Sequence, residues 1–188
     1  MELLTIDQII SLTQEETQGL DPEIREGIVL NKTDLPVSEL DRLKSQLQIQ
    51  DLNPIFRRYI LAYNWGQIGF LSYQFGYGDG TSLTWLIIRN LEYYDYSTLQ
   101  ESSLIIANGD PYTILLDCQS GAVYAVDAEM TYDEKIWLAP DFLAFVRAMG
   151  TAQSAVWKGC ESDFIHLMTR NCHASSLIFW QSLVGFYD

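Results

Sequence analysis

The sequence predicts an α+β domain: an antiparallel β-sheet of about four to six strands, helices packed on that sheet, and extra C-terminal helices. Helical patterns come first, alternating patterns with short links follow, and helical patterns return at the end. Strands joined by short turns pair antiparallel, because a parallel connection needs a dozen or more residues. The 188 residues suffice for one domain with a sizeable core.

Periodic apolar residues and capping signals predict three helices in the first third of the chain, over residues 5–19, 38–47 and 52–66. Thr5 is a candidate N-cap of the first helix, because its hydroxyl can accept from the first-turn amides. Pro54 suits the first turn of the third helix. Gly66 is a candidate C-cap of that helix.

After Gly66 the apolar period changes to two, which is typical of strands. Residues 68–75 are predicted as one strand, and residues 82–88 as another because they are rich in β-forming side chains. The glycines at 76–80 predict a turn between them. Residues 89–103 are predicted as a polar, tyrosine-rich loop that leads into a short strand.

The segment "NGDPYTILLDCQSGAVYAVD" predicts a β-hairpin whose turn is Gln119-Ser120-Gly121. If Asp117 and Ala122 flank this turn, Asp127 lies opposite Tyr112. The two aspartates are then roughly five residue steps of ~3.3 Å apart, too far for a catalytic acid and base. Asp117 is instead predicted to bind the backbone of its own turn.

The last part of the chain is predicted to be helical. The segment 138–150 contains one helix, with Gly150 past its end, and two more helical patterns cover 161–171 and 175–186. We interpret residues 151–188 as a helical extension of a single domain that spans 1–188. Ile178, Phe179, Trp180 and Phe186 give this extension a large apolar content, which could form a surface for a dimer or another partner.

The chain carries 25 acidic and 11 basic residues, a formal net charge of −14. Such a surface repels nucleic acid and anionic membranes and attracts basic partners. A contribution to solubility alone is the alternative. No apolar run reaches the ~18 residues of a membrane helix, and no basic region precedes the apolar N-terminal stretch, so we expect a cytoplasmic protein without a signal peptide.

The histidines and cysteines give only weak indications of a metal site or a catalytic site. Cys160, His166, Cys172 and His173 match no known zinc spacing, so we expect no metal and no cofactor. A hydrolase would need Cys172 with His166 or His173 and a carboxylate, and we keep this as a minor enzymatic alternative.

The more favoured hypothesis is binding. Tyrosine offers a large contact area at low entropic cost, and carboxylates select basic partners. The candidate partner-binding residues are Asp79, Glu92, Tyr93, Tyr94, Asp95, Tyr96, Asp133 and Glu134. The alternative for these tyrosines is that one or two of them anchor the core.

Four segments, taken in order, resemble the SUKH superfamily, over roughly residues 36–148. The first two are a helix with a Glu-Leu start at Glu39, and a second helix that leads into Asn64-Trp65-Gly66. The third is the hairpin segment with its Gly-Asp, Leu-Leu-Asp and Val-Tyr steps, and the fourth is "LAPDFLAFV". Leu52-Asn53-Pro54 is one residue longer than the Leu-Pro of the family, and Asn64-Trp65-Gly66 replaces its Asn-Gly.

This superfamily includes yeast regulators of cell-wall synthesis and many bacterial immunity proteins. The resemblance implies a non-enzymatic module, an immunity or antitoxin protein that neutralises a toxin domain, often a nuclease, by stoichiometric binding. A regulatory or scaffolding protein of the same fold is the alternative. The acidic charge independently indicates a basic protein partner.

Overall fold

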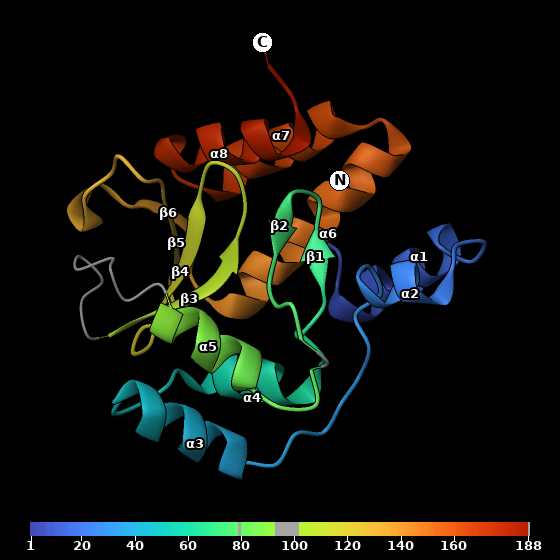
Figure 1. Ribbon diagram of the computed structural model, residues 1–188. Coiled ribbons are helices and arrows are strands. Elements are labelled where there is room, and N and C mark those ends of the chain that lie inside the picture. The colour runs from blue at the N-terminus through green and yellow to red at the C-terminus, as the bar shows by residue number, and fades with distance from the viewer. Residues whose placement is uncertain (79, 93–101, 188) are drawn as a thin grey trace.

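The computed structural model describes residues 1–78, 80–92 and 102–187. In these residues, α-helices surround one antiparallel sheet in which each strand pairs with its neighbour in sequence (Figure 1). The predicted α+β class is confirmed.

The strands are β1 (Gly69–Phe70), β2 (Tyr73–Gln74), β3 (Ser103–Asn108), β4 (Thr113–Asp117), β5 (Val123–Val126) and β6 (Ile136–Ala139). The helices are α1 (Ile6–Glu16), α2 (Pro22–Glu26), α3 (Ser38–Leu47), α4 (Pro54–Ala62), α5 (Thr84–Glu92), α6 (Phe142–Lys158), α7 (Glu161–Asn171) and α8 (Ala174–Val184), with a 3₁₀ turn, η1, at Tyr132–Glu134.

Local signals place the first helices correctly. Thr5 is the N-cap of α1, and its hydroxyl accepts from the amide of Gln8 while the Gln8 side chain accepts from the amide of Thr5. Pro54 begins α4, and the side chain of Asn53 accepts from the first-turn amides. Both helices therefore start where a short polar side chain can satisfy amides that have no helical partner.

The predicted hairpin register is confirmed. Thr113 pairs with Val126 and Leu116 with Val123, and the amide of Asp117 donates to the carbonyl of Ala122. The Asp117 carboxylate accepts from both Gln119 and Ser120 in the turn. Asp117 is thus a turn residue, as predicted.

The strand predicted over 68–75 is wrong, because this segment folds back on itself. β1 and β2 form a two-residue hairpin in which Phe70 pairs with Tyr73, and Leu71 takes a left-handed conformation at φ 52°. The reversal lets both Phe70 and Phe75 enter the core, where their rings lie 6.0 Å apart. Because burial of both large rings is favourable, the chain reverses here and does not continue as one strand.

The strand predicted over 82–88 is also wrong, because these residues belong to helix α5. Leu83, Leu86 and Ile87 are buried at helical spacing, whereas Ile88 is exposed. On the last turns of α5, the side chain of Asn90 donates to the carbonyl of Ile105 and accepts from its amide, so the helix is attached to β3. Contacts with the sheet and with α3 override the β-propensity of the segment.

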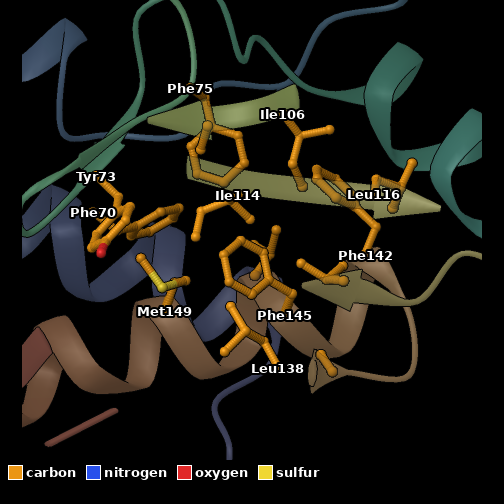
Figure 2. Packing of buried hydrophobic residues seen from close by; sticks show 14 of the residues in the cluster. Phe70, Tyr73, Phe75, Ile106, Ile114, Leu116, Leu138, Phe142, Phe145 and Met149 are labelled. Atoms are coloured by element: carbon orange, nitrogen blue, oxygen red, sulfur yellow. The ribbon is translucent and has the colours of Figure 1, made fainter. Parts of the chain in front are cut away.

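The main core lies between the sheet and α6. Figure 2 shows side chains of β3, β4 and β6 meeting those of α6, with rings of the 70–75 segment beside them. The labelled members are Phe70, Tyr73, Phe75, Ile106, Ile114, Leu116, Leu138, Phe142, Phe145 and Met149. Alternate residues Ile105 and Leu115 face the other side of the sheet, where they pack with Val126, Tyr124 and Tyr132.

The C-terminal helices complete this core. The prediction that a helix ends before Gly150 is wrong: α6 continues to Lys158, and Gly150 allows close contact with Ile9 of α1. Trp180 of α8 is fully buried against Phe145 of α6 and Phe164 of α7. Most of the apolar content expected on a surface is therefore internal, although Ile178 remains 62% exposed.

Candidate functional site

The structure describes three of the eight residues predicted to bind a partner. Asp79, Tyr93, Tyr94, Asp95 and Tyr96 lie outside the described residues. Glu92 is exposed at the end of α5, and Asp133 and Glu134 are exposed in η1. These three acids stand on two separate elements.

Within η1, Glu134 is engaged in its own turn. Its carboxylate accepts from the amide and the hydroxyl of Thr131, and these two hydrogen bonds lower the pKa of Glu134. Next to it, the ammonium group of Lys135 lies 3.6 Å from the ring centre of Tyr132 and 5.0 Å from that of Tyr124. Asp133 is therefore the carboxylate of this turn that is more available to a partner.

Sequence reasoning missed a cavity of about 500 Å³ beside α5. It opens between residues 77–78 and 80–82, one side of α5 and the end of β3. Its described lining residues are Tyr77, Gly78, Gly80, Ser82, Thr84, Trp85, Ile88, Arg89, Glu92 and Asn108. The volume falls in the range of pockets that bind small molecules or anchoring side chains. Helical spacing at Leu83, Leu86 and Ile87 was the signal that could have located one wall.

Close contacts between glycines shape the segment that forms one side of the cavity. The amide of Gly78 donates to the carbonyl of Gly66 at 2.7 Å. A Cβ on Gly66 would lie 2.3 Å from the backbone nitrogen of Gly80, a distance that real side chains do not tolerate. Gly66 was predicted as a helix C-cap, but α4 ends four residues earlier. Its actual role is to let the backbone of Gly78 and the backbone of Gly80 approach.

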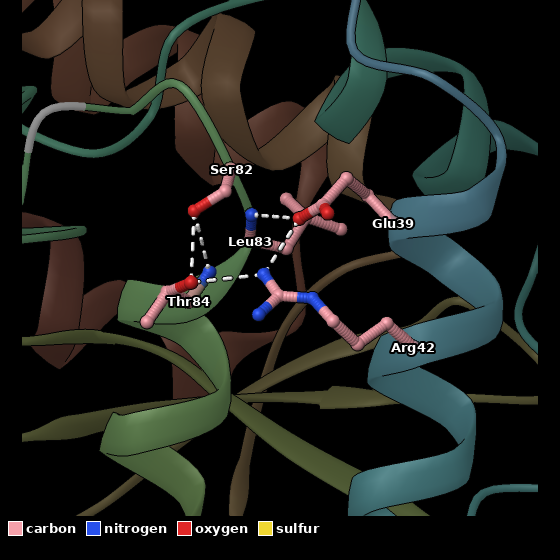
Figure 3. Close-up of polar contacts among 5 residues, drawn as sticks. All are labelled: Glu39, Arg42, Ser82, Leu83 and Thr84. Carbon is pink, nitrogen blue, oxygen red and sulfur yellow. Dashed lines mark hydrogen bonds and ion pairs between the residues drawn. The ribbon is translucent and has the colours of Figure 1, made fainter.

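The other side of the cavity is fixed by a polar cluster between α3 and α5 (Figure 3). The carboxylate of Glu39 accepts from the backbone amide of Leu83 at 2.8 Å and from the guanidinium of Arg42 at 2.7 Å. Arg42 also donates to the hydroxyl of Thr84, which in turn accepts from Ser82. Glu39 thus satisfies an amide at the start of α5 and orients two hydroxyl residues of the cavity wall.

Electrostatics keep Glu39 ionised. Burial raises the pKa of its carboxyl group, but the hydrogen bonds from Leu83 and Arg42, together with the positive charge of Arg42, outweigh that effect. The pKa of Glu39 therefore lies below its ordinary value. The contact between α3 and α5 is formed with a charged carboxylate at neutral pH.

A buried arginine lines the cavity beside two aromatic rings. Arg89 is only 5% exposed, and its guanidinium donates to the carbonyl of Gln74 in β2. Its central carbon lies 5.7 Å from the ring centre of Tyr77 and 6.0 Å from that of Trp85. The guanidinium thus connects α5 to the sheet and supports both rings from inside the protein.

Asn108, the last residue of β3, supplies an unused acceptor. Its backbone is paired with Gln74 and Thr113 on the two neighbouring strands. Its side-chain Oδ1 is buried, and no donor reaches it. A buried acceptor without a donor is costly, typically ~1–3 kcal/mol, so such groups commonly mark sites where a ligand or water completes the bonding.

The enzymatic alternative named Cys172, His166 and His173, which lie on or beside α7 and α8. Burial raises the pKa of the Cys172 thiol, and burial followed by the charge of Asp117 raises that of Cys118 to about 12. A nucleophilic cysteine needs the opposite shift. His173 precedes α8 and packs edge-on against Trp137 at 4.8 Å, while His166 is exposed on α7.

Two kinds of feature are absent from the described residues. Within residues 1–78, 80–92 and 102–187, no group of three or more His, Cys, Asp or Glu side chains is placed to hold a metal ion. Over the same ranges, none of the helices has both the length and the apolarity needed to span a membrane.

No protein-family model matches the chain, and no curated protein sequence matches it.

Proposed function

We propose that this chain is a non-enzymatic protein-binding module that recognises a basic protein, and that it acts as an immunity or antitoxin protein by stoichiometric binding. The observation that carries the proposal is the exposed, unneutralised acidic charge. Among the described residues, ion pairs involve only two acids: Asp7 pairs with Lys32 at 3.7 Å, and Glu39 with Arg42. The other described acids form no ion pair, so their charge can attract a basic partner.

Two acidic stretches illustrate this charge. Between residues 15 and 26, the exposed acids outnumber the one basic side chain, Arg25; they are Glu15, Glu16, Asp21, Glu23 and Glu26. Around η1, the exposed acids are Glu129, Asp133 and Glu134. Complementary charge accelerates encounter with a basic protein and disfavours acidic competitors. A nuclease toxin is basic where it grips phosphates, so it has the expected complementarity.

The resemblance of four segments to the SUKH superfamily, which includes many bacterial immunity proteins, supports the immunity role. The regulatory or scaffolding alternative is favoured slightly by the apolar content of the C-terminal helices, which could form a partner surface. Because Phe179 and Trp180 are buried, only scattered apolar side chains such as Ile178 and Tyr187 remain exposed there. The acidic surface is therefore the better supported binding feature.

Affinity capture from the native host, followed by mass spectrometry, tests this proposal. We expect a basic protein in a one-to-one complex whose affinity falls steeply between about 50 mM and 500 mM salt, as screening shortens the Debye length. The matched variants replace Glu15, Glu16, Glu23 and Glu26 by Gln in one protein, and Glu129, Asp133 and Glu134 by amides in another. Loss of affinity in one variant identifies the stretch in contact.

Two results would contradict the proposal. One is a captured partner without basic charge, whose affinity is insensitive to salt. The other is an absence of stoichiometric partners together with neighbouring genes that encode no toxin-like protein.

A further inference from the structure

The cavity beside α5 combines an aromatic wall, an unused acceptor and an unpaired carboxylate. We propose, on the basis of the function above, that this cavity receives an arginine side chain of the basic partner. Each of the three features selects one property of that side chain.

The unused acceptor selects a hydrogen-bond donor. Asn108 Oδ1 is buried at the cavity without a donor. A guanidinium carries five N–H donors and no acceptor, so it can satisfy this oxygen and still bind other groups. A partner's carboxylate would instead place its lone pairs against those of Oδ1.

The wall selects a planar group on an apolar stem. Tyr77 and Ile88 are 81% and 46% exposed, and both line the cavity together with Trp85. Three methylenes of an arginine can lie against Ile88 while the guanidinium lies on a ring. A lysine ammonium is more strongly hydrated and offers no planar face, so it fits this wall less well.

The distribution of charge selects a cation despite the presence of Arg89. Glu92 is exposed at the cavity, and no described residue forms an ion pair with it. Arg89 also lines the cavity, but it is only 5% exposed and its guanidinium donates to the carbonyl of Gln74. The more accessible charge for an incoming side chain is therefore the carboxylate of Glu92.

Binding of blocked amino acids to the ¹⁵N-labelled full chain tests the assignment. The probes are the N-acetyl, N-methylamide derivatives of arginine, citrulline, lysine and glutamate; citrulline has nearly the shape of arginine without its charge. We expect the arginine probe to shift the resonances of Ser82, Thr84 and the Asn108 side-chain amide in a saturable manner. Citrulline and lysine should bind at least about fivefold more weakly.

Variants separate this site from general charge. Glu92→Gln should weaken the arginine probe about threefold to tenfold, whereas Glu16→Gln on α1, the same change on a remote exposed helix, should leave its affinity unchanged. Asn108→Ala should also weaken it, with the spectrum elsewhere confirming the fold. Equal binding of lysine, preferential binding of glutamate, or no effect of Glu92→Gln would overturn the proposal.

The experiments distinguish failure of the arginine site from failure of the proposed function. A salt-sensitive complex with a basic partner whose affinity is the same for Glu92→Gln and for wild type refutes the arginine site and leaves the function standing. Saturable binding of the arginine probe without any basic partner in the host supports the site and refutes the function.

Discussion

Local sequence patterns predict the hairpin of β4 and β5 correctly, but they fail for the segment from Gly66 to Glu92. The hairpin follows its sequence residue by residue: the register, the turn and the role of Asp117 are as predicted. The second segment has alternating and β-rich patterns but folds into a minimal hairpin, a glycine-rich turn and helix α5. The first is determined by contacts a few residues apart, the second by contacts with distant parts of the chain.

The difference can be traced to where the partners lie. Asp117 binds amides two and three residues away. The start of α5 is instead satisfied by Glu39, 44 residues earlier, and Gly66 meets Gly80 across a turn of the backbone. Prediction from local patterns works for the first arrangement and fails for the second. The candidate cavity is built mainly in the second region, so the local patterns did not reveal it as a cavity.

The largest expected effect is that of Gly66→Ala. The added Cβ would meet the backbone of Gly80 at 2.3–2.4 Å, and backbone cannot move aside cheaply. We expect a loss of about 3 kcal/mol or more in the free energy of unfolding, measured by urea denaturation. Gly19→Ala is the matched control, because nothing lies within 4 Å of its Cβ, and it should be nearly neutral. Equal stability of the two variants would show that the glycine contact does not hold the 76–80 segment.

The second effect is that of Glu39→Ala, which leaves the Leu83 amide and Arg42 without their acceptor. We expect a loss of about 2 kcal/mol at pH 7. Because the folded-state pKa of Glu39 is depressed, its stabilisation is present above the unfolded pKa near 4.5 and is lost as the pH falls through the folded value. The difference in unfolding free energy between wild type and variant should therefore shrink as the pH falls below about 4.

Asp41→Ala is the control for this second prediction, since Asp41 lies on the same helix turn and is exposed. Its effect should be within about 0.5 kcal/mol. A Glu39 variant that behaves like the Asp41 variant at neutral pH would mean that α5 forms from its own sequence, without the contact from α3.

The smallest effect is that of Asp117→Ala in the hairpin. It removes an exposed acceptor of turn hydrogen bonds, and we expect a loss of about 1 kcal/mol in urea denaturation. Asp117→Asn keeps a side-chain oxygen at the same place and should recover most of this loss. A loss that Asn does not recover would show that the charge matters more than the turn, and that the hairpin is less local than it looks.

The distinction between local and distant contacts also explains the other correct and incorrect predictions from the sequence. Thr5 and Pro54 were placed correctly because a cap or a first-turn proline acts within one helical turn. Gly150 was taken as a helix end because glycine often follows one, yet it lies inside α6 where Ile9 needs the space. For the site, Glu92 was among the predicted residues, whereas Trp85, Arg89 and Asn108 were not.

By itself, the sequence determined the fold class, the helix starts, the β4–β5 register and an acidic surface, because each depends on composition or on neighbours a few residues apart. Tertiary structure decided that residues 82–88 are helical, that Trp180 belongs to the core, and that Tyr77, Trp85, Glu92 and Asn108 share one cavity. The physical reason is that burial and satisfaction of distant polar groups outweigh local propensities of a few tenths of a kcal/mol per residue.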